Sequence, residues 1–162
     1  MQQWQVMPPP GASSPISQSL YGLAAGCLNK SERRRIGGFQ NRCLRSIWGI
    51  KTAYISRVSN ARVLELTGQR PLTRRLEYQQ LVLFGKVARL SDDSIVREST
   101  FCPGCLRPAA ERYVRKVGRP RLDWATEIHK LALAAAGSLG RLDEAIVDDC
   151  AWRRLAKAYA AR

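Results

Sequence analysis

The chain has 162 residues, with 27 Lys or Arg against 13 Asp or Glu and a formal net charge of +14. That length is typical of one domain and allows a hydrophobic core without disulfide bonds. No apolar run approaches the roughly 18 residues of a membrane-spanning helix, and the first residues lack the basic and apolar regions of a secretory signal. The sequence therefore argues against membrane-spanning and secreted proteins, and we expect an intracellular protein, nuclear or cytoplasmic.

The positive charge is concentrated in the middle of the chain. Residues 1–29 carry no charged side chain, residues 30–121 carry 21 Lys or Arg against 7 Asp or Glu, and residues 122–162 carry 6 against 6. An ordinary solvated surface mixes both signs, so this imbalance favours a polyanionic partner. RNA or DNA is the leading partner class. An anionic membrane surface is the weaker alternative, because no long apolar anchor accompanies the charge, and no small-molecule substrate is expected.

Four segments follow one another along the chain. Residues 1–19 form a Pro-, Ser- and Gln-rich tail, 20–109 a basic helical region, 110–121 a basic linker, and 122–162 a C-terminal helical pair. The tail is predicted to be disordered. No alternating run of β-branched residues is long enough to form a competing strand. We therefore predict an all-α fold, an irregular bundle of about five to six short to medium helices with a disordered N-terminus.

The first predicted helix begins near Ser31, as its N-cap, and ends at Gly49. Apolar residues at helical spacing predict its buried face, namely Ile36, Phe39, Cys43, Leu44 and Ile47. Arginines are predicted to project from the opposite face, namely Arg34, Arg35, Arg42 and Arg45. Such a helix is suited to contact phosphates, although a charged outer face is often only solvated.

Two further helices continue this arrangement. The first covers residues 60–67, with Ser59 as its N-cap and Gly68 as its stop. The second starts at Pro71, ends at about Leu90, and is predicted to bury Leu72, Leu76, Leu83, Val87 and Leu90. The side chains predicted to project from its other face are Arg74, Arg75, Lys86 and Arg89.

Weaker patterns complete the chain. A short helix is expected near residues 93–101, followed by a turn at residues 102–105. The next predicted helix ends at Gly137, and its apolar stripe is Trp124, Ile128, Leu131 and Ala135. The last predicted helix begins near Asp148 or Asp149 and buries Trp152, Leu155 and Tyr159.

The five cysteines form an odd set without a regular framework, which fits a reducing compartment. Cys102 and Cys105 have the spacing of half a zinc site. The other candidate ligands, His129 and Cys150, lie too far along the chain for a zinc knuckle, so two free thiols in a loop are the preferred interpretation. We expect no cofactor, with zinc at Cys102 and Cys105 as the alternative.

Two pairs of adjacent carboxylates are candidates for metal-dependent catalysis, Asp92-Asp93 and Asp148-Asp149. Polymerisation needs carboxylates from separate strands that converge on two metal ions, and neither pair has flanking strands. Turn and helix-cap roles are the preferred interpretation of both pairs. We expect no catalytic residue and no enzymatic activity.

The predicted linker carries a further set of cations, Arg115, Lys116, Arg119 and Arg121. Gly118-Arg119-Pro120-Arg121 could lie extended in an A·T minor groove, where the narrow walls intensify the negative potential. A linker whose Pro120 begins the next helix is the preferred interpretation. Tyr54 and Tyr78 could stack on unpaired bases, although helix packing is the simpler use of each.

Several of these segments together carry a family resemblance. They are Leu20-Tyr21-Gly22, residues 39–50 (FQNRCLRSIWGI), Arg57-Val58-Ser59-Asn60, Leu66-Thr67-Gly68, residues 83–93 (LFGKVARLSDD), Gly118-Arg119-Pro120-Arg121 with Trp124, and Ala151-Trp152-Arg153. This ordered series resembles the region downstream of the polymerase domain in LINE-type (non-LTR) retrotransposon reverse transcriptases. It covers roughly residues 20 to 159. The Trp-containing sequence usual after Leu-Tyr-Gly is replaced here by residues 23–28 (LAAGCL), and the polymerase part is absent.

The resemblance implies a C-terminal fragment of an RNA-directed DNA polymerase. Such a fragment would hold RNA or DNA through its arginine-lined helices, beside a missing polymerase domain, without a catalytic centre of its own. The alternative is a structural or protein-interaction module whose apolar stripes complete a core with a missing partner domain. A retroelement relic without a present role is a third interpretation.

Overall fold

The computed structural model describes residues 20, 22–109 and 123–161, and the fold there is all-α, as predicted. A short 3-10 helix, η1, precedes eight α-helices in this part of the chain. Their bounds are η1 Leu23–Ala25, α2 Lys30–Ile47, α3 Ala53–Ser56, α4 Asn60–Thr67, α5 Leu72–Ala88, α6 Ile95–Thr100, α7 Trp124–Ala136, α8 Leu139–Val147 and α9 Asp149–Ala161. The described residues contain no β-strand, and one isolated antiparallel bridge joins Phe101 to Pro108. The predicted N-terminal tail lies outside the described residues.

Local capping sets several helix ends where the sequence predicts them. Ser59 Oγ accepts a hydrogen bond from Arg62 N at 3.2 Å, and Gly68 ends α4 in the left-handed conformation with φ of 63°. Gly137, with φ of 86°, ends α7 in the same way. These glycines stop their helices because an L side chain is disfavoured at positive φ.

Two predictions about helix ends and number are wrong. The N-cap of α2 is Asn29, two residues before Ser31, because Asn29 and Glu32 form a capping box with backbone–side-chain hydrogen bonds of 2.9 and 2.7 Å. The predicted C-terminal pair is three helices, since Ser138 caps the additional helix α8 directly after Gly137. With α3 also unpredicted, the count rises above the expected five to six.

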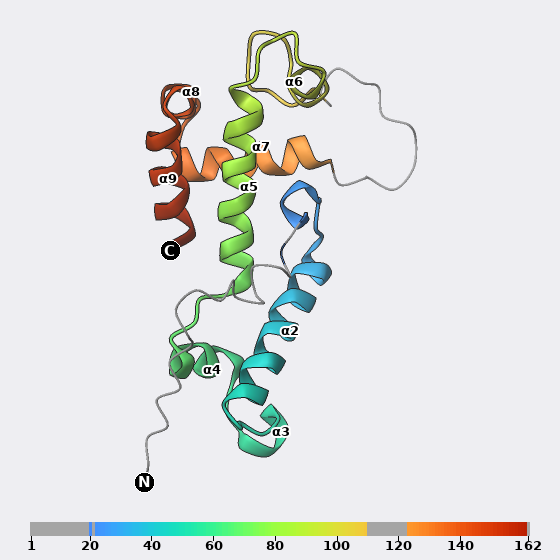
Figure 1. The fold of residues 1–162 in the computed structure, drawn as a ribbon, viewed down its shortest axis with the longest axis vertical. Coiled ribbons are helices and arrows are strands. Elements are labelled where there is room, and N and C mark those ends of the chain that lie inside the picture. The colour runs from blue at the N-terminus through green and yellow to red at the C-terminus, as the bar shows by residue number, and fades with distance from the viewer. Residues whose placement is uncertain (1–19, 21, 110–122, 162) are drawn as a thin grey trace.

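Helix α5 lies at the centre of the molecule and is packed against helices from both halves of the chain (Figure 1). Its fully buried Phe84 packs edge-on to Phe101 with ring centroids 5.4 Å apart. The Trp152 indole of α9 is also fully buried, and its Nε1 donates to Leu81 O at 2.7 Å. These contacts hold α9 antiparallel along α5 and form the main core (Figure 1).

A glycine allows this close approach. A Cβ atom added at Gly85 would lie 2.3 Å from Cδ1 and 2.5 Å from Nε1 of Trp152. Any larger side chain at position 85 must therefore displace the indole.

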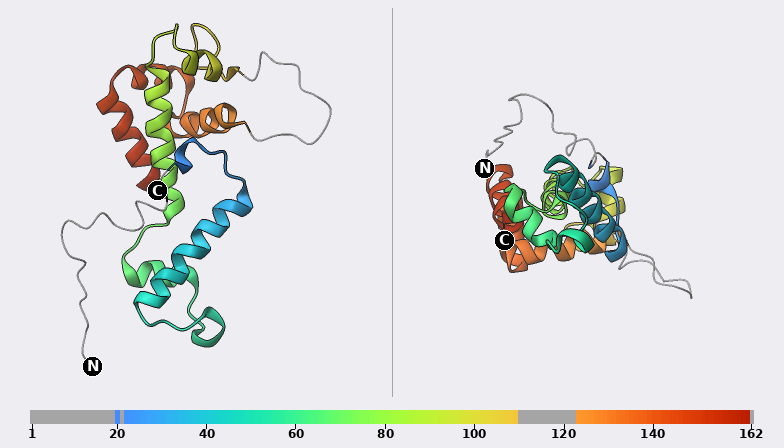
Figure 2. Two further views of the ribbon diagram at one scale, coloured as in Figure 1. Left: turned by 45° about the vertical axis from the view of Figure 1, so that its right-hand side comes forward. Right: turned by 90° about the horizontal axis from the view of Figure 1, so that it is seen from below.

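A second, smaller core attaches α2 to the first turns of α5. It contains Leu20, Leu72 and Leu76, with Leu28 and Ile36 packed against them. Helices α2, α3 and α4 lie at one end of the molecule, and α6 to α9 lie at the other end around α5, whose N-terminal end points toward α2 and α4 (Figures 1 and 2). The N-terminal end of α5 is thus the place where the two ends of the molecule meet.

Candidate nucleic-acid interface

Three of the predicted arginines of α2, Arg34, Arg35 and Arg42, are exposed to solvent. The predicted apolar stripe of this helix is rotated from the observed buried face. Phe39 and Ile47 of that stripe are 48% and 74% exposed. Leu44 of that stripe is buried as predicted, and the other buried residues of the helix are Gln40, Asn41 and Arg45.

Arg45 is the clearest correction, because it is buried and does not lie on an exposed face. Its guanidinium donates to Lys51 O at 2.9 Å and to Val58 O at 2.6 Å, which are carbonyls on the two sides of α3. It also reaches Ser56 Oγ at 3.4 Å and Asn60 Oδ1 at 3.2 Å. Arg45 therefore holds the α3 loop in place and is not available to a phosphate.

Arg89, at the end of α5, is also engaged within the protein. It is half-buried, pairs with the Asp149 carboxylate, and donates to Ile146 O at 3.2 Å. These bonds join the C-terminal end of α5 to the junction of α8 and α9. Arg89, which the sequence predicts to project into solvent, thus links α5 to α8 and α9.

The remaining arginines of α5 line an open groove with a volume of about 700 Å³. The groove lies between the α4–α5 loop, the first turns of α5 and the last turns of α9. Its charged lining residues, which define what we call the basic groove, are Arg70, Arg74, Arg75 and Lys157, and Tyr78 lines it with them. No carboxylate lines it among the residues that the structure describes.

The cations of the basic groove are only partly compensated. Arg74 forms an ion pair with the Glu77 carboxylate at 3.0 Å, and Arg33 forms a second ion pair with the same carboxylate at 3.3 Å. Arg70 and Lys157 are exposed, and neither side chain forms an ion pair with a carboxylate in residues 20, 22–109 or 123–161. The groove therefore presents net positive charge that an anion can neutralise.

Gln40 of α2 fixes one wall of the groove. Its carboxamide is almost completely buried, donates from Nε2 to Arg70 O at 2.7 Å, and accepts at Oε1 from Leu72 N at 2.8 Å. Both bonds flank Pro71, so one side chain holds the backbone on either side of the turn into α5. The groove wall is thus formed before any ligand arrives.

The structure does not bring all predicted arginines together. Successive helix residues are about 100° apart, so Arg42 points about 160° away from Gln40, which lines the groove. Arg35 likewise lies on the outer side of α2. The single cationic surface expected from the sequence is therefore divided into the basic groove and the outer face of α2. The other predicted contacts, Arg115, Lys116, Arg119 and Arg121, lie outside the described residues.

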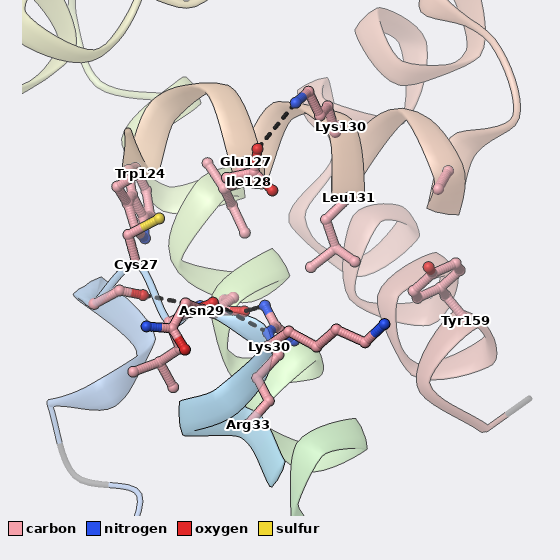
Figure 3. Close-up of a pocket in the computed structure, with 14 residues that line it drawn as sticks. Cys27, Asn29, Lys30, Arg33, Trp124, Glu127, Ile128, Lys130, Leu131 and Tyr159 are labelled. Carbon is pink, nitrogen blue, oxygen red and sulfur yellow. Dashed lines mark hydrogen bonds and ion pairs between the residues drawn. The ribbon is translucent and has the colours of Figure 1, made fainter. Parts of the chain in front are cut away.

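A second pocket, of about 490 Å³, lies between the start of α2 and helices α7 and α9 (Figure 3). Its charged residues have mixed signs, since Glu127 lies among Lys30, Arg33 and Lys130. Lys130 donates to Glu127 at 2.9 Å. The pocket is consequently less suited to a polyanion than the basic groove.

Cys27, in this second pocket, is expected to react slowly with thiol reagents. Burial is the main cause that raises the pKa of its thiol, and the carboxylates of Glu127 and Asp123 raise it further. Only the thiolate is nucleophilic, so Cys27 should be alkylated by iodoacetamide several-fold more slowly than the exposed Cys150 at about pH 8. Mass spectrometry of tryptic peptides over time measures both rates, and faster reaction of Cys27 would contradict the expected order.

One carboxylate pair lies in a turn and the other at the start of α9, which are the positions that the turn and helix-cap interpretation predicts. The Asp148 carboxylate accepts from Cys150 N and Ala151 N at the start of α9. Asp149 pairs with Arg89 and Arg153, while Asp92 lies in a turn. These carboxylates therefore cap, link or connect helices.

Cys102 and Cys105 lie in a turn closed by the hydrogen bond from Cys105 N to Cys102 O. Both are free and half-buried, and Cys102 Sγ lies 3.6 Å from Pro108 O. No group of three or more His, Cys, Asp or Glu side chains in the described ranges is placed to hold a metal ion.

The two candidate stacking residues have different environments. Tyr54 on α3 is 82% exposed, with the Arg57 guanidinium 5.6 Å from its ring centroid, so it is not used for helix packing. Tyr78 packs against the main core and also lines the basic groove.

Sequence reasoning missed Arg70, Lys157 and Gln40 as parts of the basic groove. Of these, only Arg70 had a local signal, its position beside Arg74 and Arg75.

Comparisons with protein-family models, with curated protein sequences and with solved structures find no match to this chain. In the described segments, no helix combines the length and apolar character needed to cross a lipid bilayer.

Proposed function

We propose that this protein binds RNA or DNA, with the basic groove as its principal contact, and that it has no catalytic centre of its own. The observation that carries the proposal is a groove lined by four cations and no described carboxylate. Phosphate contacts by Lys and Arg supply most of the affinity of sequence-independent nucleic-acid binding. The outer face of α2, with Arg34, Arg35 and Arg42, is proposed as a second contact.

The sequence resemblance supports the same proposal. In a LINE-type reverse transcriptase, a basic helical region downstream of the polymerase would hold template or target beside the active centre. The residues that carry the resemblance include Phe39 to Ile50 and Leu83 to Asp93. A polymerase partner domain is accordingly the proposed protein neighbour of this chain.

The affinity for nucleic acid is expected to fall steeply with salt. Each phosphate contact on a single strand contributes about −0.7 to the slope of log affinity against log salt concentration, because bound counterions are released. Fluorescence anisotropy with a labelled oligonucleotide, as RNA and as DNA, measures this slope. Replacing Arg70 and Lys157 together by glutamine should weaken binding by about tenfold or more and flatten the slope by about 1.4.

A matched control separates the groove from the overall charge. Arg107 and Arg141 are both exposed, and their side chains form no ion pair within the described residues. Replacing this pair by glutamine removes the same charge elsewhere and should change affinity by less than about threefold. Binding that ignores salt, or equal losses in the two double variants, would argue against the groove. A triple variant of Arg34, Arg35 and Arg42 tests the second contact.

A protein-interaction module is the second candidate function, favoured by an exposed apolar cluster. Ile47, Trp48, Tyr54 and Ile55, at the end of α2 and on α3, are all more than half exposed. Large apolar side chains that are exposed on a monomer are typical of surfaces covered by a partner when they form a patch. Concentration-dependent association that is abolished by Trp48→Ser and Ile55→Ser would support this function.

A further inference from the structure

We propose that the basic groove holds an unpaired nucleotide of a single strand, with its base against Tyr78 and its phosphate between Arg70 and Lys157. This inference rests on the proposed nucleic-acid binding and specifies the form of nucleic acid that the groove selects.

Tyr78 is placed to form a stacking surface beside the cations. It follows Arg75 by three residues and Arg74 by four on α5, so the three side chains share one face of the helix. Tyr78 is half-buried and packed against the main core, which fixes its position, while part of it still lines the groove. An anchored aromatic ring with guanidinium groups at its side is the combination that binds unpaired bases.

Other residues that line the groove are suited to the phosphate. Pro71, the N-cap of α5, lines the groove at the positive end of a 17-residue helix, where the N–H of Leu72 is already bound by Gln40 Oε1. Arg70 precedes that end, and Lys157 reaches the groove from α9. Neither cation is paired with a carboxylate in the described ranges, so a phosphate would supply the missing negative charge.

The shape of the groove favours an unpaired nucleotide over a duplex. Its volume of about 700 Å³ is within the range of small-ligand sites, which is enough for one base with its sugar and phosphate. A base inside a duplex is stacked between its neighbours and cannot meet an aromatic side chain unless it is first extruded. A duplex could touch only the cations at the rim.

Binding of a single strand of about 15 thymidines is therefore compared with binding of a blunt duplex of equal length, by anisotropy at one salt concentration. Tyr78→Leu should weaken single-strand binding by about tenfold and duplex binding by less than about twofold, while Tyr78→Phe should retain single-strand affinity. Tyr159→Leu is the matched control, because Tyr159 is also half-buried but lines the second pocket.

A measurement on the unaltered protein avoids any effect of substitution on folding. A single strand containing 5-iodouracil is photocrosslinked to the protein, and the adduct is located by peptide mass spectrometry. The adduct should lie on Tyr78, and an adduct confined to Tyr54 or Trp48 would overturn the inference. Absence of binding to either nucleic acid would reject the proposed function itself. Equal affinity for strand and duplex, equally reduced by Tyr78→Leu, would reject only the unpaired-nucleotide site.

Discussion

Replacing Trp152 by alanine is expected to lower the free energy of unfolding by about 3–5 kcal/mol. The indole is fully buried between α9 and α5, packs against Phe84 with ring centroids 5.8 Å apart, and donates a hydrogen bond to Leu81 O. Its removal leaves a cavity at the centre of the main core, which the surrounding helices can only partly fill. Urea denaturation followed by circular dichroism measures the loss.

A double-mutant cycle makes this prediction specific to one contact. Gly85→Ala alone should cost about 1–3 kcal/mol, because the new methyl group meets the indole of Trp152. In the Trp152→Ala background the same methyl group has space, so the two costs should not add. Trp48→Ala, at a 52% exposed tryptophan, should change stability by about 0.5 kcal/mol or less. Additive costs at positions 85 and 152 would contradict the observed packing of α9 on α5.

Replacing Arg45 by methionine is expected to cost about 2–4 kcal/mol and to open the loop that contains α3. The methionine keeps the length of the side chain but removes the donors to Lys51 O and Val58 O. A buried carbonyl that loses its hydrogen-bond donor has given up its contact with water and gains no hydrogen bond in return, which lowers the stability of the folded state. Hydrogen exchange should therefore become faster in α3, particularly at Arg57 N, which donates to Ala53 O.

Arg42→Met is the matched control, since Arg42 lies on the same helix but is exposed. It should alter the free energy of unfolding by about 0.5 kcal/mol or less. If Arg45→Met had as small an effect, the four hydrogen bonds of its guanidinium would contribute little to holding α3. Retained nucleic-acid affinity in Arg45→Met, at a temperature where the variant is folded, is also expected because Arg45 does not line the groove.

Local signals in the sequence are sufficient to predict a helix end where that end depends only on neighbouring residues. Helix α4 begins after Ser59 and ends at Gly68 because each residue acts on backbone groups within one turn. The end of α7 at Gly137 has the same cause. The class of the fold followed from such elements, since helical periodicity covers most of the chain and no strand pattern competes with it.

The errors concern residues whose roles depend on distant parts of the chain. Helical periodicity sorts residues by polarity and therefore predicts that Arg45 faces solvent, whereas its four acceptors lie 6 to 15 residues ahead. Gln40 is buried for a similar reason, through bonds to residues 30 and 32 positions away. Such acceptors become neighbours only when the loops fold back, and a helix pattern contains no information about them.

Only some of the cations of the basic groove can be predicted from the sequence. The sequence places Arg74 and Arg75 side by side at the start of a helix, but Lys157 comes from the other end of the chain. Its contribution depends on the antiparallel packing of α9 on α5, which is fixed by Trp152 and Gly85. The same packing places Asp149, at the start of α9, beside Arg89. Because Arg89 forms an ion pair with Asp149, it is not available to a phosphate.

The paired bonds of Gln40 determine how sharply a polymer must bend to touch both cationic surfaces. Because they tie α2 to both sides of Pro71, α2 cannot turn about its axis without losing two hydrogen bonds, so its outward arginines keep a constant direction relative to the groove. A chain that reaches from the groove to those arginines must bend around a helix only about 10–12 Å across. Double-helical DNA is stiff over about 150 base pairs and cannot follow so tight a path, whereas a flexible single strand can.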